Sequence, residues 1–227
     1  MAAGSSSVRI LCQALLFDMD GLLISSLGSV ERSWTRWARM RGVDPAEVLR
    51  IAHGCRAIET VRALRPDLDS ESELKVIEGF EMADGDGIAA LPGVLELLAA
   101  LPPNRWTVVT SATERLARAR LAAGGVPPPE KLISAELVTQ GKPHPQPFLA
   151  GAAALGFPPP QCVVFEDAPS GVKSGRAAGC TVVATPYSHP LNSLADAHYV
   201  VEDLRQVTAV PLPDGRGLQL EITPLAR

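Results

Sequence analysis

Two aspartates separated by one residue follow a short apolar segment near the start of the chain. The segment covers residues 13–17, and it leads into Asp18-Met19-Asp20-Gly21. Alternate side chains of an extended segment point to the same side, so this spacing places both carboxylates together. Gly21 permits the chain to turn sharply after them. Such a motif alone is more often part of a loop than of a catalytic site, so its meaning depends on what accompanies it.

Three further polar features lie where strands are expected to end or on the loops beyond them. Ser111-Ala112 stands between a predicted strand and a predicted helix, where a hydroxyl group and backbone N–H groups can hold a phosphate. Lys142 is a cation on a loop stiffened by two prolines, and Glu166-Asp167 follows another apolar strand. Open parallel sheets bind ligands at the carboxyl ends of their strands, and chance rarely places four such features in this order. The sequence therefore predicts that the four features belong to one shared site.

The acidic residues of these features would require a cation if they converge. Two like charges about 4 Å apart repel each other by ~4 kcal/mol at an effective dielectric constant of about 20. Several such pairs would rival the whole free energy of folding. The carboxylates concerned are those of Asp18, Asp20, Glu166 and Asp167. Because no cysteine or histidine accompanies them, the oxygen ligands favour a hard ion, and Mg²⁺ fits better than zinc.

The elements that must position these residues follow from the pattern of apolar segments. Short apolar segments alternate with helical patterns, which is typical of an α/β fold built around a parallel sheet. Thr113 and Ser170 are candidate N-caps of two helices that end near residues 124 and 179, and residues 145–155 form a third helix. The predicted strands are residues 13–17, 106–110, 162–165, 180–184, 199–201 and 218–222.

The segment between about residues 27 and 91 breaks this alternation, because it contains helical patterns and no convincing strand. Val30, Trp34 and Trp37 recur at helical spacing and form one apolar stripe. Residues 70–73, with the sequence Ser-Glu-Ser-Glu, have the pattern of a capping box at the start of a further helix. We therefore expect a helical domain inserted into the core. The expected division is a core of residues 8–26 and 91–227, a cap of residues 27–90 and a flexible tail of residues 1–7.

The composition of the chain excludes several classes of function. With 227 residues and a net charge of −4, the chain carries no basic field of the kind that binds nucleic acid. No stretch approaches about 18 apolar residues, so we expect neither a membrane span nor a signal peptide. The four cysteines show no C-x-x-C spacing, which indicates reduced thiols and a cytoplasmic protein. The chain is small enough to act as a monomer.

Taken together, the motifs resemble those of the haloacid dehalogenase-like phosphatases. The shared pattern is D-x-D-G, T-S, K-P and E-D in that order, followed by residues 168–179, and it covers about residues 13–201. The resemblance implies a Rossmann-like parallel-sheet core with an inserted α-helical cap. It also implies phosphoryl chemistry, because the dehalogenases of this superfamily lack the second aspartate of the motif, which is Asp20 here.

The same resemblance implies a role for each polar residue of the motifs. Asp18 attacks phosphorus and forms an aspartyl phosphate, while Asp20 protonates the leaving oxygen and then activates water. Ser111, Lys142 and the N–H group of Ala112 hold the oxygens of the transferred phosphoryl group. The chain is therefore expected to be a phosphatase.

The cofactor that the resemblance implies is Mg²⁺. Its ligands would be Asp18, Asp167 and the backbone carbonyl of Asp20, with Glu166 assisting directly or through a water molecule. A cis peptide bond before Pro143 would aim the neighbouring lysine at the site.

The cap segment His53-Gly54-Cys55-Arg56 resembles that of glycerol-3-phosphate and 2-deoxyglucose-6-phosphate phosphatases. Arg56 would then reach a substrate oxygen, with His53 beside it, and the substrate would be a small phosphorylated sugar or polyol. On physical grounds alone, an exposed arginine and a hydrogen-bonded histidine explain these residues equally well.

Two other interpretations stay open at this point. β-Phosphoglucomutase is a relative of these phosphatases that returns the phosphoryl group to the sugar, although Ser25 here replaces an aspartate that many family members carry. A metal-binding scaffold or regulatory subunit could use the same fold without catalysis. The intact motifs argue against the scaffold, and the replacement at Ser25 weakens the mutase interpretation. The function that we predict is hydrolysis of a small sugar or polyol phosphate.

Overall fold

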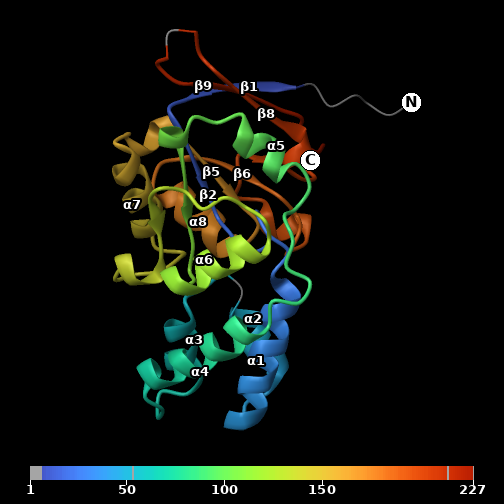
Figure 1. Cartoon of the computed structure of the whole chain (residues 1–227), viewed down its shortest axis with the longest axis vertical. Coiled ribbons are helices and arrows are strands. Elements are labelled where there is room, and N and C mark those ends of the chain that lie inside the picture. Colours follow the sequence, from blue (N-terminus) through green and yellow to red (C-terminus); the bar gives the residue numbers. More distant parts are fainter. Residues whose placement is uncertain (1–6, 53, 214, 227) are drawn as a thin grey trace, which may run out of the picture.

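The computed structural model describes residues 7–52, 54–213 and 215–226. A parallel sheet lies at the centre of this described part (Figure 1). Its six strands are in the order β4-β3-β2-β5-β6-β7. The strands are β2 (Ala14–Phe17), β3 (Trp106–Val109), β4 (Leu132–Ile133), β5 (Cys162–Glu166), β6 (Thr181–Ala184) and β7 (Tyr199–Val200). Since β2 lies between β3 and β5, the strand order reverses beside it, which is where open sheets bind ligands. The predicted α/β fold is confirmed.

Apolar side chains fill both faces of this sheet. Alternate residues of β2 point to opposite faces, so Leu15 and Phe17 pack in one cluster and Leu16 packs in another. Burial on both faces explains why the strands are continuous apolar segments in the sequence. The helices that contribute to the first cluster are α5 (Val94–Ala99) and α6 (Glu114–Ala123), and those of the second are α7 (Gln146–Leu155) and α8 (Pro169–Ala177).

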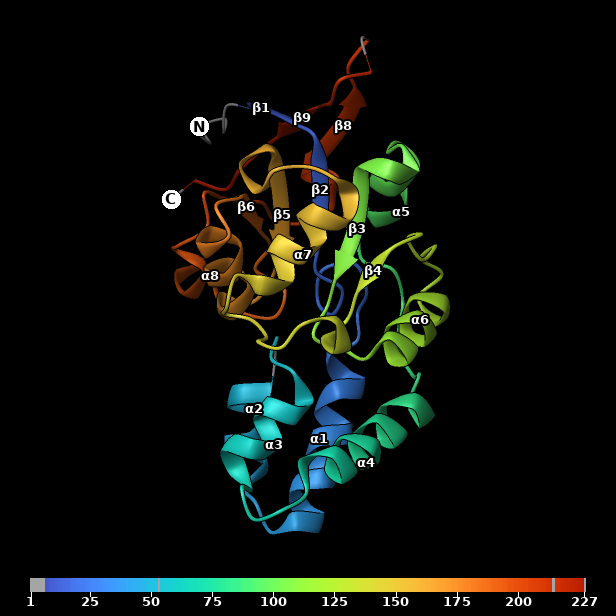
Figure 2. The same ribbon diagram turned by 90° about the vertical axis from the view of Figure 1, so that its left-hand side faces the viewer.

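Four helices form a separate layer beyond the carboxyl ends of the strands (Figure 2). They are α1 (Leu27–Arg41), α2 (Pro45–Ala52), α3 (Ala57–Leu64) and α4 (Ser70–Ala83). The four helices share an apolar cluster that is separate from those of the sheet. The predicted apolar stripe of α1 packs in it, and its residues Val30, Trp34 and Trp37 are at most 7% exposed. This separate cluster supports the proposed division of the chain, and α1–α4 are called the cap below.

A small antiparallel sheet lies at the opposite end of the molecule from the cap (Figure 1). Its strands are β1 (Val8–Cys12), β9 (Leu218–Ile222) and β8 (Val207–Pro211), in that order across the sheet. β9 lies where the sequence predicts a strand, whereas β1, β8 and β4 lie where no strand is predicted. Exposed and buried residues mix in β1 and β8, and β4 has two residues, so none of the three forms an apolar segment of useful length.

The predicted starts of three helices are correct in one case and wrong in two. Thr113 caps α6 as predicted, because its side chain accepts a hydrogen bond from a backbone N–H group of the first turn. α8 begins at Pro169, which has no N–H group to satisfy, so Ser170 lies inside the first turn. Asp69 caps α4 through its carboxylate, and it replaces the predicted capping box that starts at Ser70.

The remaining helical elements are single turns of 3₁₀-helix. They are η1 (Pro103–Arg105), η2 (Ala135–Leu137), η3 (Pro159–Gln161), η4 (Leu191–Leu194) and η5 (Leu204–Gln206). Across the described residues, no helix combines the length and the apolar character that crossing a membrane requires.

Candidate active site

Neighbouring parallel strands deliver the acidic residues to one edge of the sheet. Phe17 of β2 lies opposite Phe165 of β5 in the register of the sheet. The residues that follow, Asp18 and Glu166, are therefore side by side, and the N–H group of Asp18 donates to the carbonyl of Phe165 at 2.9 Å. Asp167 comes one residue later. Strand pairing thus brings together residues that are far apart in the sequence.

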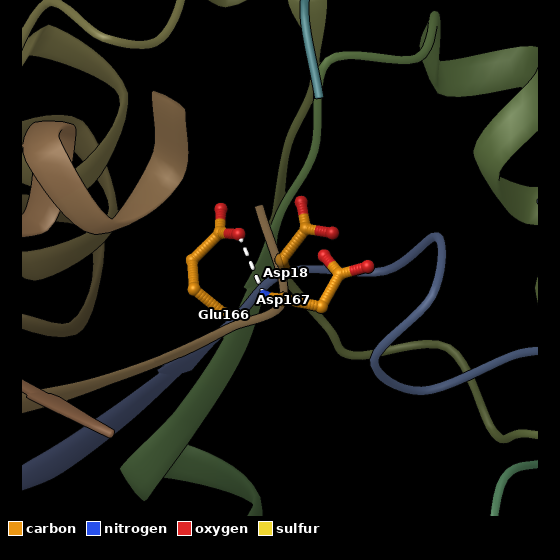
Figure 3. Close-up of side chains that lie close together, drawn as sticks. All are labelled: Asp18, Glu166 and Asp167. Atoms are coloured by element: carbon orange, nitrogen blue, oxygen red, sulfur yellow. Dashed lines mark hydrogen bonds between the residues drawn. The ribbon is translucent and has the colours of Figure 1, made fainter. Parts of the chain in front are cut away.

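The carboxylates of Asp18, Glu166 and Asp167 converge (Figure 3). One oxygen of each lies within 4.8 Å of the others, and all three residues are buried. Gly21 permits this arrangement, since its φ of 81° suits glycine and an added Cβ would lie 2.0 Å from Oδ2 of Asp167. We call these three residues the acidic cluster. Asp20, the fourth predicted acid, is not part of it.

The ammonium group of Lys142 lies between two of these carboxylates. Nζ donates to Oδ1 of Asp18 at 2.5 Å, to Oε1 of Glu166 at 2.7 Å and to the carbonyl of Val109 at 3.0 Å. Its donors are therefore all used, and the side chain is 1% exposed. The peptide bond between Lys142 and Pro143 is cis, as predicted.

Glu166 is held at both of its carboxylate oxygens. Oε1 accepts from Lys142, while Oε2 accepts from the N–H groups of Asp167 at 3.0 Å and Ala168 at 3.1 Å. An added Cβ at Gly171 would lie 1.7 Å from Oε1, so α8 approaches this carboxylate closely. Of the two predicted options, these contacts favour a metal contact of Glu166 through water over a direct one.

Burial dominates the electrostatics of the acidic cluster. It raises the pKa of Asp18 to about 7 against the opposing effect of Lys142, and Glu166 raises it further. The pKa of Asp167 is also well above its usual value, through burial and the charge of Asp18. Burial disfavours the charge of Lys142, but the neighbouring carboxylates raise its pKa. When ionised, the cluster keeps an excess of negative charge, and its oxygen ligands fit a hard divalent cation such as Mg²⁺.

Two of the three predicted phosphate donors, Ser111 and Ala112, follow β3 and line the cavity between the cap and the acidic cluster. The third, Lys142, donates to protein oxygens here, and its contact with phosphate stays a prediction. The hydroxyl of Ser111 donates to the carbonyl of Gly54 in the cap at 3.0 Å. The N–H group of Ala112 donates to Oγ1 of Thr110 at 3.1 Å. A bound phosphate would replace these internal hydrogen bonds, and the phosphate-binding role of both residues stays a prediction.

Arg56 is buried at the boundary between the cap and the core and is 8% exposed. Its guanidinium group donates to three backbone carbonyls of the core, those of Ala135, Val138 and Thr139, at 3.2, 2.7 and 3.0 Å. It also pairs with Glu59 at 2.8 Å. These contacts make Arg56 an anchor of the cap, and its contact with substrate stays a prediction. His53, the other predicted cap residue, lies outside the described residues.

Asp20 has partners that the sequence motifs do not identify. Its Oδ1 accepts from the hydroxyl of Ser26 at 2.5 Å, and both of its oxygens lie 3.1 Å from Nη1 of Arg120. Arg120 is buried on α6 and also lies 3.3 Å from Oε1 of Glu81 on α4. The sequence carries a signal for this arginine, which shares the buried stripe of α6 with Leu116. A charged side chain at such a position needs a partner.

Residues 12–179 match the family described as haloacid dehalogenase-like hydrolase. The matched range contains the whole acidic cluster, Lys142 and all four cap helices. The chain belongs to the haloacid dehalogenase-like hydrolase family. The resemblance carried by the motifs is thereby confirmed.

Named relatives in this hydrolase family cover most of the chain. Hexitol phosphatase A of Escherichia coli (strain K12) is 43% identical over 209 residues, which cover 90% of this chain and 97% of the relative. Glycerol-1-phosphate phosphohydrolase 1 of Saccharomyces cerevisiae is 36% identical over 196 residues, covering 81% of this chain and 78% of the relative. A solved β-phosphoglucomutase from Clostridium difficile has a TM-score of 0.75 at 22% identity, covering 86% and 92% of the two chains. At that identity the likeness concerns the fold alone.

Proposed function

We propose that this hydrolase is a Mg²⁺-dependent phosphatase that acts on a small phosphorylated sugar or polyol. The observation that carries the proposal is the buried pairing of Asp18 with Lys142 within the acidic cluster. Asp18 and Asp167 line a cavity between the core and the cap, where a substrate can reach them. The names of the two relatives, a hexitol phosphatase and a glycerol-1-phosphate phosphohydrolase, support the class of substrate.

The first half of the proposed reaction transfers the phosphoryl group to Asp18. A carboxylate oxygen of Asp18 bonds to phosphorus, the bond from phosphorus to the ester oxygen breaks, and that oxygen takes a proton from Asp20. Lys142 orients the attacking carboxylate through Oδ1 and balances its charge. Asp18, Asp167 and the backbone carbonyl of Asp20 would hold Mg²⁺, which supplies positive charge for the phosphoryl oxygens.

The second half of the reaction regenerates Asp18. Asp20 takes a proton from a water molecule, the water oxygen bonds to phosphorus, and the bond from phosphorus to Asp18 breaks to release inorganic phosphate. Ser111, Lys142 and the N–H group of Ala112 would donate to the phosphoryl oxygens in both halves. Asp20 is thus acid first and base second, so its carboxyl group must exchange hydrogen-bond partners during each turnover.

The charges around the cavity support water, and not a second sugar oxygen, as the acceptor. A mutase that phosphorylates a sugar phosphate must hold a second phosphoryl group, and this requires a cation that is available to bind it. Among the described residues that line the cavity, the cations are Arg56 and Arg120, and both are paired with protein groups. Glu78 and Glu81 add carboxylates on the cap side. This arrangement supports hydrolysis over the mutase reaction.

Release of phosphate from a panel of sugar, polyol and glycerol phosphates tests the proposed function. We expect release with Mg²⁺, loss of release with a chelator and loss in Asp18→Asn, while Asp196→Asn at an exposed position keeps its activity. An isomerised sugar phosphate as the main product would identify a mutase. No reaction with any member of the panel would favour a scaffold without catalysis.

We also propose that the protein is a cytoplasmic monomer. The four cysteines are free thiols, and three of them are buried, as expected in a reducing compartment. Cell fractionation tests the location, and size-exclusion chromatography with light scattering tests the oligomeric state.

A further inference from the structure

A buried arginine connects the proposed acid–base residue with the cap. Nη1 of Arg120 lies 3.1 Å from each carboxylate oxygen of Asp20, and Nη2 lies 3.3 Å from Oε1 of Glu81. Asp20 follows the central strand β2, Arg120 lies on the core helix α6, and Glu81 lies on the cap helix α4. The side chains of Arg120 and Glu81 are 4% and 8% exposed, whereas that of Asp20 is 24% exposed and lines the cavity. One enclosed cation therefore joins carboxylates from two parts of the chain.

This arrangement gives Arg120 a choice of counterion. An unpaired guanidinium group is unfavourable in a buried place, so Arg120 must keep at least one carboxylate. With α4 against α6, as in this structure, Arg120 contacts both Asp20 and Glu81. Glu81 can then serve as its counterion alone, so Asp20 can leave Arg120 and turn toward a substrate oxygen. If α4 moves away, Glu81 leaves with it and Asp20 stays bound to the arginine. A hydrogen bond from Thr113 to Glu78 at 2.9 Å joins the same two helices.

We propose that Arg120 is a positioning residue that couples proton transfer by Asp20 to the docking of the cap, with Glu81 as its partner on the cap. The inference rests on the proposed function, in which Asp20 exchanges partners during turnover. The bonds that form and break are those of the proposed reaction, and Arg120 keeps its own protons throughout. Ser26, which directly precedes α1 of the cap, donates its hydroxyl to the same carboxylate at 2.5 Å.

A purely structural ion pair would have a different kinetic signature. It would change activity through the amount of folded protein, and therefore by one factor for every substrate. Donation of a proton matters most when the leaving oxygen is basic, and it matters little when the leaving group departs readily as an anion. Phenyl phosphate and 4-nitrophenyl phosphate have similar shapes and differ mainly in this property.

The test compares kcat/KM for these two substrates in the full-length protein with Mg²⁺. For each substrate, kcat/KM reports the steps up to departure of the leaving group and does not include hydrolysis of the aspartyl phosphate. For Glu81→Gln and Arg120→Met we expect kcat/KM to fall about tenfold or more with phenyl phosphate and less than about threefold with 4-nitrophenyl phosphate. Arg120→Lys keeps the positive charge without the forked donor geometry of arginine. Its kcat/KM values should therefore lie between those of the unchanged protein and those of Arg120→Met. Assays at about pH 8 keep Glu81 ionised, because its pKa is raised to about 7.

Matched controls remove exposed charges from the same two helices. Glu71→Gln on α4 and Arg118→Met on α6 should change both values by less than about twofold. Thermal unfolding checks the fold of each variant, and the nearly isosteric Glu81→Gln carries the test if Arg120→Met does not fold. Equal losses on both substrates, or no loss, would overturn the inference and leave the proposed function intact. If the unchanged protein hydrolyses neither these substrates nor the sugar and polyol phosphates, the proposed function fails, and the inference fails with it.

Discussion

The acidic cluster of the core and the boundary between cap and core differ in how their residues come together. In the cluster, Asp18, Glu166 and Asp167 follow adjacent parallel strands, and the pairing of the backbone determines their spacing. At the boundary, Glu81 and Arg120 belong to two helices that meet through their side chains. The first arrangement follows from strand order, whereas the second depends on how two parts of the chain sit against each other.

This difference separates two tasks that the molecule would perform. The charges of the cluster are paired within the sheet and its loops, so they are in place whether or not the cap moves. The ion pair between Glu81 and Arg120 exists only while α4 is docked on the core. Substitutions in the cluster should therefore remove the chemistry or weaken the fold, and substitutions at the boundary should change how the protein responds to substrate and pH.

Replacement of the proposed nucleophile is the largest test of the cluster. Asp18→Asn should lower kcat by about 10³-fold or more, because an amide oxygen is a much weaker nucleophile than a carboxylate. The same change should not destabilise the metal-free protein, since burial already raises the pKa of Asp18 to about 7. Phosphate release and thermal unfolding measure the two effects. A variant that keeps more than about a tenth of the activity would exclude Asp18 as the nucleophile.

Removal of the buried lysine tests whether the cluster also supports the fold. Lys142→Met leaves Asp18 and Glu166 buried without their counter-charge, so we expect a loss of about 3 kcal/mol in the free energy of unfolding. Urea denaturation without Mg²⁺ measures it. Lys173→Met, at an exposed position of α8, should change the same quantity by less than about 0.5 kcal/mol. Equal stabilities of the two variants would show that the fold does not need the charge of Lys142.

The cluster could be predicted from the sequence because each step has a local signal. The apolar segments before Asp18 and Glu166 predict buried parallel strands, and parallel strands place their carboxyl ends at one edge of the sheet. Gly21 indicates a sharp turn, and the side chain of Asp167 packs against that turn. The cis bond before Pro143 has no such local signal: it is an expectation from the family resemblance, and the structure contains it. Here the order of the elements along the chain contains enough information to bring the residues together.

The boundary could not be predicted in the same way. Arg56 donates to backbone carbonyls of the core. Because every residue has a backbone carbonyl, no residue type in the sequence indicates where such a contact forms. Arg120 stands out as a charge within the buried stripe of α6, but nothing in the sequence says that its partners are Asp20 and Glu81. Recognising such pairs requires the position of the cap on the core.

The anchor formed by Arg56 sharpens the comparison from the side of the cap. Arg56→Met removes donors from three core carbonyls, of which that of Val138 is in a fully buried hydrogen bond, so we expect a loss of about 2 kcal/mol in stability. We also expect faster proteolysis of residues 84–91, which lie between the cap helix α4 and the core helix α5. Arg50→Met, at an exposed position of α2, is the matched control. If Arg56 acts only as an anchor, kcat/KM should fall by a similar factor for substrates of different shape. A loss confined to sugar or polyol phosphates would instead assign Arg56 to substrate binding.

The smallest expected effect concerns the pH dependence of stability at the boundary. Burial raises the pKa of Glu81 from 4.5 to about 7, although Arg120 opposes the shift. The folded state then binds a proton on Glu81 more tightly than the unfolded state does, so this group's contribution to the free energy of unfolding falls as the pH rises from about 4.5 to about 7. Glu81→Gln removes this titration. Over that pH range, the free energy of unfolding of the variant should therefore fall by about 1–2 kcal/mol less than that of the unchanged protein.

Urea denaturation of the metal-free protein at about pH 5 and about pH 8 measures this difference. Glu71→Gln, whose side chain is exposed on the same helix, should follow the unchanged protein. Asp18→Asn removes the corresponding titration of the cluster, because the pKa of Asp18 is also raised to about 7 by burial. The two variants therefore divide the pH dependence between the two regions. The free energy of unfolding of Glu81→Gln could instead change with pH as much as that of the unchanged protein. In that case the pKa of Glu81 is not raised, and the pH dependence arises from the acidic cluster.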